Sequence, residues 1–113
     1  MARPSALTTH ILDTAAGAPA QGVKVELWRI DPAGAVKVTE RRTNADGRTD
    51  TPLLTPDDFL PGRYELRFHI GAYFGGGGFL DVVPIAVRLE AGQGHYHVPL
   101  LCSPWSYATY RGS

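Results

Sequence analysis

The chain has 113 residues, of which 43% are hydrophobic and 19% charged, and these values are typical of one globular domain rather than of a disordered segment. Eleven basic and eleven acidic residues give a net charge of zero, which removes the electrostatic basis for binding nucleic acid or an anionic membrane. The single cysteine excludes an internal disulfide framework, and no apolar run approaches the roughly 20 residues of a spanning helix. The first nine residues lack the apolar core of a signal peptide, so we expect a cytoplasmic protein without a membrane partner.

The first half of the chain predicts short strands joined by turns. Apolar and polar residues alternate in three stretches, as they do in strands with one buried face. Gly, Pro, Asn and Asp cluster between these stretches, which indicates turns and loops. We expect strands over residues 7–13, 23–28 and 35–43, a loop over 13–22, turns at 31–34 and 46–47, and a short strand followed by a loop over 51–58.

The second half continues the pattern and contains its clearest alternation, over residues 63–70. A helical turn fits residues 72–74, and the four glycines at 75–78 end it because glycine is unfavourable in a helix. A strand follows over residues 83–89, and Pro84 favours a place for it at a sheet edge or a bulge. The last two strands begin at His95 and at Trp105, the second reaching Tyr110. Seven or eight short strands without a longer helix predict an all-β sandwich formed by one domain over residues 1–113.

Three histidines are candidates for chemistry. His95 and His97 are two positions apart, so one strand face carries both, and His10 from the first strand could complete a zinc site. Solvated or packed histidines are the simpler interpretation. A third interpretation is metal-free acid–base catalysis, in which two histidines on non-adjacent strands of one sheet activate a water and protonate a leaving nitrogen. The residues alone leave these three interpretations open.

Arg48 and the C-terminal residues are the other candidates. Arg48 follows the turn signal Asp46-Gly47, and its fork of donors suits an oxygen-rich substrate or an oxyanion, although a solvated turn arginine is the simpler interpretation. The chain ends on Tyr110-Arg-Gly-Ser113, which places aromatic, cationic and carboxylate groups together. Most termini are without consequence, whereas this composition is typical of part of a site.

Four motifs together resemble one family, that of the transthyretin-related 5-hydroxyisourate hydrolases. The resemblance spans the chain from Leu7 to its end, and the most specific part is the combination of the His-Tyr-His-Val-Pro run with the terminal Tyr-Arg-Gly-Ser. The motifs are Leu7-Thr-Thr-His-Ile-Leu-Asp-Thr14, Thr43-Asn-Ala-Asp-Gly-Arg48, His95-Tyr-His-Val-Pro-Leu-Leu and Tyr110-Arg-Gly-Ser113. The resemblance implies a prealbumin/transthyretin-like β-sandwich of two four-stranded sheets with one short helical turn. It also implies a homotetramer, a dimer of dimers, with its sites at the interface between dimers.

The resemblance further implies which residues act. His10, Arg48 and His97 match the family's catalytic positions, and His10, Arg48, Tyr110 and Ser113 match its substrate-binding positions, which leaves His95 peripheral. The implied reaction is metal-free and cofactor-free hydrolysis of 5-hydroxyisourate to 2-oxo-4-hydroxy-4-carboxy-5-ureidoimidazoline in urate degradation. In it the histidine pair activates water, Arg48 stabilises charge on oxygen, Tyr110 binds the substrate, and the carboxylate of Ser113 closes the pocket. Which histidine is the base stays open.

Residues 75–84 depart from the family's pattern, in which Phe-Phe-Pro or Phe-Tyr-Pro often precedes the next strand. This chain has Phe79-Leu-Asp81 and a later proline, Pro84, without an N–H for strand pairing where subunits meet. The change is remote in sequence from the histidines, so it bears on subunit geometry rather than on activity. The alternative function is a transthyretin-like carrier that binds a small aromatic ligand in the channel of the tetramer.

Overall fold

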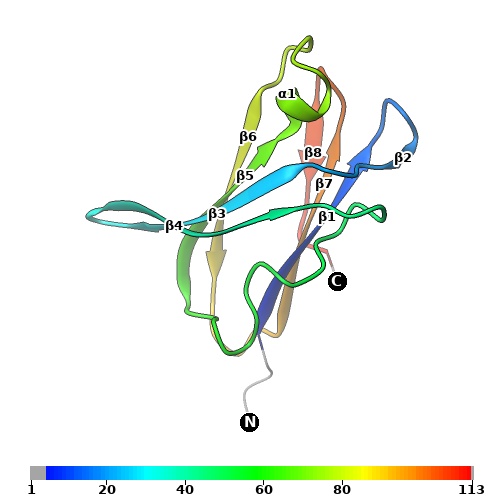
Figure 1. Ribbon diagram of the computed structural model, residues 1–113. Coiled ribbons are helices and arrows are strands. Elements are labelled where there is room, and N and C mark those ends of the chain that lie inside the picture. Colours follow the sequence, from blue (N-terminus) through cyan, green and yellow to red (C-terminus); the bar gives the residue numbers. More distant parts are fainter. Residues whose placement is uncertain (1–4, 113) are drawn as a thin grey trace.

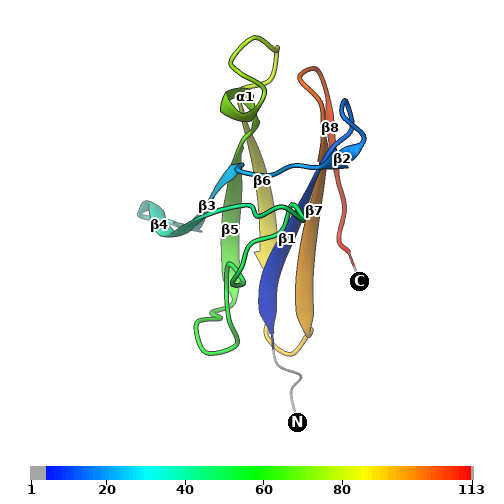
Figure 2. The same ribbon diagram turned by 45° about the vertical axis from the view of Figure 1, so that its right-hand side comes forward.

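A computed structural model describes residues 5–112, which form two four-stranded sheets packed face to face (Figures 1 and 2). The first sheet has the order β2-β1-β7-β8, with β1 at Ala6–Asp13, β2 at Ala18–Pro19, β7 at His95–Cys102 and β8 at Tyr107–Thr109. The second has the order β4-β3-β5-β6, with β3 at Lys24–Asp31, β4 at Gly34–Arg42, β5 at Gly62–His69 and β6 at Val82–Leu89. One helical turn, α1, covers Ile70–Tyr73. The predicted sandwich of two four-stranded sheets with a helical turn is confirmed.

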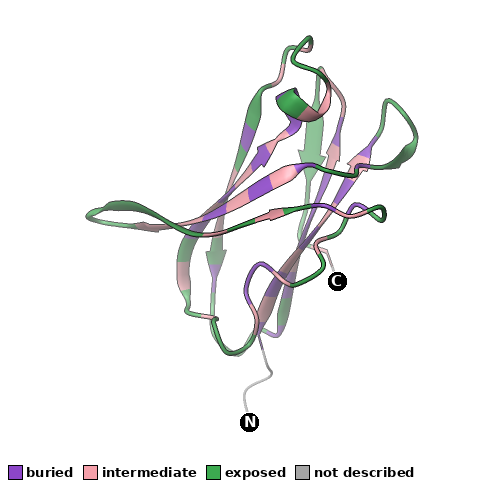
Figure 3. Cartoon of the chain, in the orientation of Figure 1, coloured by how far each residue is buried: buried purple, intermediate pink, exposed green. Residues whose placement is uncertain are grey.

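The core lies between the two sheets and follows from alternation along the strands. Burial alternates residue by residue in β1, β3 and β5, so each strand turns one apolar face inward (Figure 3). Fully burying one such leucine or phenylalanine contributes about 1.5–3 kcal/mol, so this inner layer accounts for much of the driving force for folding. The largest fully buried side chains are Phe68, Leu7, Ile11, Leu27, Leu54, Leu66, Ile70, Leu89 and Leu100.

Strands β1 and β7 pair directly and in parallel, although they come from opposite ends of the chain. The register places Thr8 opposite His97, Ala6 opposite His95 and His10 opposite Pro99. The expectation that the histidines occupy non-adjacent strands was therefore wrong for His10 and His97. A pairing between strands this far apart in sequence depends on the packing of the whole sandwich, and the periodicity of either strand contains no sign of it.

Several boundaries differ from the predicted ones. Residues 51–58 form no strand, because they meet the first sheet only through an isolated bridge between Leu54 and Leu7, with the Leu7 amide donating to the Leu54 carbonyl at 2.9 Å. The expected loop over 13–22 contains the two-residue strand β2, and Ile70 belongs to α1 rather than to the preceding strand. The last strand, β8, is shorter than the predicted 105–110 and spans Tyr107–Thr109.

Strand β6 lies at the edge of its sheet, as the proline in it predicted. Pro84 stands opposite Arg67 of β5, and the other side of β6 has no neighbour within the described chain. Within residues 5–112 no helix is long and apolar enough to cross a membrane.

Candidate active site

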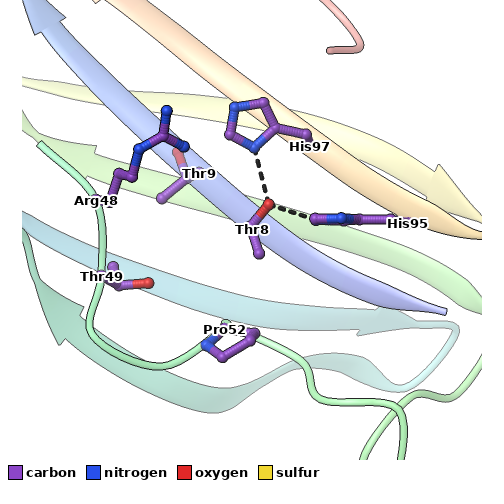
Figure 4. Close-up of a pocket in the computed structure, with 7 residues that line it drawn as sticks. All are labelled: Thr8, Thr9, Arg48, Thr49, Pro52, His95 and His97. Carbon is purple, nitrogen blue, oxygen red and sulfur yellow. Dashed lines mark hydrogen bonds between the residues drawn. The ribbon is translucent and has the colours of Figure 1, made fainter. Parts of the chain in front are cut away.

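A pocket of about 320 Å³ opens on the outer face of the β1–β7 pair, next to the loop that follows β4 (Figure 4). Its volume falls in the range of small-molecule sites, roughly 300–1,000 Å³. The lining residues are Thr8, Thr9, Arg48, Thr49, Pro52, His95 and His97. The pocket thus brings together imidazoles from the end of the chain and a guanidinium from its middle.

A tight turn presents Arg48 to the pocket. The side-chain Oδ1 of Asn44 accepts hydrogen bonds from the amides of Asp46 at 2.9 Å and Arg48 at 3.2 Å, which closes the turn. Gly47 has a φ of +75°, and a Cβ at this position would lie 2.3 Å from the Ile11 carbonyl oxygen. The turn can therefore approach β1 only with glycine at position 47, and the amide of Ile11 donates to the Gly47 carbonyl at 2.8 Å.

His10 is held to the same turn. Its Nε2 lies 2.9 Å from the carbonyl oxygen of Asp46, and its backbone forms an isolated bridge with that of Arg48. A carbonyl only accepts, so Nε2 carries the proton and neutral His10 has its lone pair on Nδ1. His10 lies beside the pocket, outside the set of residues that line it.

His97 is the half-buried imidazole of the pocket. Its Nδ1 lies 2.8 Å from the hydroxyl of Thr8, which leaves Nε2 free on the side of the pocket where Arg48 lies (Figure 4). Burial lowers the pKa of His97 below the usual 6.5, and the nearby Arg48, His95 and His10 lower it further. Neutral His97 therefore predominates at neutral pH, as a general base requires.

The terminal segment runs antiparallel beside β7 and pairs with it at His97. The amide of Gly112 donates to the His97 carbonyl at 2.7 Å, and a Cβ at position 112 would lie 2.6 Å from His97 Cδ2. Arg111 fixes the segment from the other face, with its guanidinium carbon 4.3 Å from the centroid of the Tyr96 ring. The glycine of the terminal motif thus allows the tail to pass close over the imidazole.

His95 lines the same pocket as His97. Its Nε2 is 2.6 Å from the Thr8 hydroxyl, and the rings of His95 and His97 are 6.2 Å apart, centroid to centroid. Sequence reasoning missed Thr8 altogether, although Thr8 and His10 share the polar face of a predicted strand. What singles Thr8 out is its place opposite His97, which depends on the β1–β7 register.

Tyr110 lies away from this pocket in the single chain. Its side chain is 61% exposed and borders a different hollow, between β8 and residues 85–89 of β6. Ser113 lies outside the described residues. Within residues 5–112 no group of three or more His, Cys, Asp or Glu side chains lies where it could hold a metal ion, so His10, His95 and His97 do not form a tri-histidine ligand set.

Fold and site together define a class: a transthyretin-like sandwich whose outer sheet face carries a histidine and arginine pocket suited to acid–base chemistry. Residues 7–112 match the model of the HIUase/Transthyretin family. The chain belongs to this family.

Individual relatives agree with this assignment. The chain is 51% identical over 113 residues to 5-hydroxyisourate hydrolase from Deinococcus radiodurans, with 95% of each chain covered. Its structure is similar to that of Klebsiella pneumoniae 5-hydroxyisourate hydrolase, with a TM-score of 0.82 and 34% identity over 100% of this chain and 97% of the other. Its structure is also similar to that of (S)-allantoin synthase, with a TM-score of 0.88 and 42% identity. This match covers 98% of the present chain but only 44% of the longer synthase chain.

Proposed function

We propose that this chain, as one domain over residues 1–113, hydrolyses 5-hydroxyisourate to 2-oxo-4-hydroxy-4-carboxy-5-ureidoimidazoline in urate degradation. The main support is one pocket in which an imidazole of lowered pKa, His97, shares its walls with the guanidinium of Arg48. The second support is that relatives matched over almost their whole length are named 5-hydroxyisourate hydrolase.

In the proposed mechanism His97 is the base. Its Nε2 takes a proton from a water while the water oxygen bonds to the ring carbonyl carbon of the substrate. The Arg48 guanidinium stabilises the negative charge that develops on the carbonyl oxygen. The carbon–nitrogen bond then breaks, and the leaving nitrogen takes the proton from His97. No metal or cofactor enters these steps.

His10 has a supporting role in this proposal. Its Nε2–H is held by the Asp46 carbonyl, so its Nδ1 lone pair can accept a hydrogen bond from the attacking water and orient it. Because Asp46 and Arg48 belong to the same turn, the position of His10 is tied to that of the guanidinium.

The complete site is proposed to form in a homotetramer, a dimer of dimers. The pocket opens on an outer sheet face, and a second copy across that face could contribute Tyr110 and Ser113, which the family pattern assigns to substrate binding. The cytoplasmic location remains a prediction from the sequence.

The second candidate is the transthyretin-like carrier of a small aromatic ligand. A carrier needs a hollow face but has no need for an imidazole kept neutral beside a guanidinium. The observed pair of His97 and Arg48 therefore favours the hydrolase.

The decisive measurement follows the ultraviolet signal of freshly made 5-hydroxyisourate. We expect the protein to speed its decay well above the spontaneous rate, and His97→Asn to reduce kcat about 100-fold or more, as expected for a lost acid–base group. His97→Asn should keep the melting temperature close to that of the wild type. Ligand binding without any acceleration of decay would instead establish the carrier.

A further inference from the structure

The hydroxyl of Thr8 joins two imidazoles (Figure 4). Its Oγ1 lies 2.8 Å from Nδ1 of His97 and 2.6 Å from Nε2 of His95. A threonine hydroxyl has one proton to donate and lone pairs with which to accept. When both rings are neutral and both contacts are hydrogen bonds, Thr8 can donate to only one ring, so at least one ring donates to Thr8. The two rings therefore cannot both present a lone pair to Thr8, and the tautomer of one ring limits that of the other.

Arg48 gives this chain of hydrogen bonds a direction. Nε2 of His97 is on the side of the pocket where the Arg48 guanidinium lies, and a cation there favours a lone pair over an N–H group (Figure 4). Neutral His97 then carries its proton on Nδ1 and donates it to Thr8. When both contacts run in this direction, Thr8 donates to Nε2 of His95, and neutral His95 carries its own proton on Nδ1.

Burial increases along this series of hydrogen bonds, from His95 to His97. His95 is exposed, whereas Thr8 and His97 are partly buried. The hydrogen bonds thus connect the reacting side of the pocket with its solvent side. A threonine that only filled space between two strands would not need its hydroxyl within hydrogen-bonding distance of both rings.

We propose that Thr8 is a positioning residue that fixes the tautomer of His97, and that Thr8 and His95 together relay protons between His97 and solvent. This inference rests on the hydrolase function proposed above. Sequence comparison with the family assigned no role to Thr8 and left His95 at the periphery.

The relay balances in both directions. When His97 Nε2 takes a proton from the attacking water, the Nδ1 proton passes to Thr8 Oγ1, the Thr8 hydroxyl proton passes to His95 Nε2, and the His95 Nδ1 proton passes to solvent. When the leaving nitrogen takes the proton from His97 Nε2, the same transfers run in reverse. The new carboxylic acid ionises at neutral pH, so each turnover releases one proton.

Four variants test the two roles. Thr8→Val removes the hydroxyl while keeping the shape, and Thr8→Ser restores the hydroxyl. His95→Gln keeps a group that can hydrogen-bond to Thr8 but cannot pass a proton on. Thr14→Val is the matched control, because the Thr14 hydroxyl donates to the Cys102 carbonyl at 3.0 Å, beyond the far end of β1.

Two readouts are measured on each variant. Nitrogen-15 spectra of protein labelled on histidine report the tautomer of His97, with assignments from His97→Asn and His95→Gln. Hydrolysis of 5-hydroxyisourate gives kcat across pH, in dilute buffer and with increasing imidazole, which can replace a missing proton acceptor.

We expect wild-type His97 to be protonated on Nδ1 and Thr8→Val to lose this preference. Thr8→Val should lower kcat at least about tenfold, short of the about 100-fold or more for a lost acid–base group, and Thr8→Ser should recover most of it. His95→Gln should lower kcat in dilute buffer and regain activity as imidazole increases. Thr14→Val should match the wild type in both readouts.

Other results overturn the proposal. An unchanged His97 tautomer and an unchanged kcat in Thr8→Val exclude the positioning role. Full activity of His95→Gln in dilute buffer excludes the relay. If the wild type itself fails to speed 5-hydroxyisourate decay, the proposed function is wrong, and the nitrogen-15 spectra still decide whether Thr8 sets the His97 tautomer.

Discussion

At the scale of single residues, the protonation of His97 predicts how activity depends on pH. Burial and the neighbouring Arg48 lower the pKa of His97 below 6.5, so the base stays neutral into mildly acidic solution. We expect kcat/KM to be level near neutral pH and to fall only below about 6.5, the pKa of an unperturbed histidine. A profile that already falls between pH 8 and 7 would contradict this assignment.

The same pKa shift predicts a change in stability with pH. Because the folded state holds His97 less protonated than the unfolded state does, the contribution of His97 is complete above the unfolded pKa of about 6.5 and is lost as the pH falls through the lower folded value. Urea unfolding should therefore show a larger drop in stability between pH 7.5 and 5.5 for the wild type than for His97→Asn. Equal drops would mean that His97 titrates alike in both states.

Gly112 is the second residue with a specific prediction. A methyl group at position 112 would lie 2.6 Å from His97 Cδ2, so Gly112→Ala must shift the tail or the imidazole. A misplacement of about 1 Å can cost about 100-fold in rate, and we expect a loss of that order in kcat with little loss of stability. Gly77→Ala is the control, since nothing lies within 4 Å of a Cβ at that position. Equal activity of the two variants would exclude a close approach of the tail in solution.

Sequence reasoning reached His10, Arg48 and His97 because they lie in the motifs that the chain shares with the family, since nine arginines do not by themselves single out Arg48. The roles assigned to them remain predictions. Thr8 was beyond its reach, because one threonine on a polar strand face looks like any other until the partner strand is known. The contact of His95 with Thr8 was beyond its reach for the same reason, since it arises from the pairing of two distant strands.

At the scale of elements, the turn that carries Arg48 makes the sharpest prediction. Gly47→Ala combines a φ of +75° with a Cβ 2.3 Å from the Ile11 carbonyl oxygen, whereas Gly17→Ala has a similar φ of +70° and open space. We expect Gly17→Ala to cost about 1–2 kcal/mol from the left-handed backbone alone. Gly47→Ala should cost clearly more and also lower kcat by moving Arg48. Urea unfolding and hydrolysis measured on both variants check this, and equal stabilities would mean that the close approach carries no strain.

The elements themselves were largely predictable. Alternation located β1, β3, β5, β6 and β7 because each has one buried face, and Pro84 correctly indicated an edge strand. Residues 51–58 were misassigned because they form a loop whose Leu53 and Leu54 are buried against β1. Buried apolar residues alone do not distinguish a loop from a strand. Strand β2 has only two residues, too few for any periodicity.

At the scale of the whole molecule, the proposed tetramer can be tested by mass and by dilution. We expect light scattering to give four times the 12.2 kDa chain mass. If the site needs Tyr110 and Ser113 from another copy, specific activity should fall when dilution dissociates the tetramer, whereas a chemically cross-linked sample should keep its activity. A fully active monomer would contradict the shared site.

The parallel pairing of β1 with β7 also has a consequence for synthesis of the chain. During translation β1 emerges first, and its parallel neighbour is not made until residues 95–102 leave the ribosome. Until then β1 has only β2 beside it, and the edge that will pair with β7 is exposed. Exposed strand edges are prone to aggregation. Pairing across most of the chain also raises the contact order, which slows folding. The register that places Thr8 opposite His97 thus leaves β1 without this partner strand until late in translation.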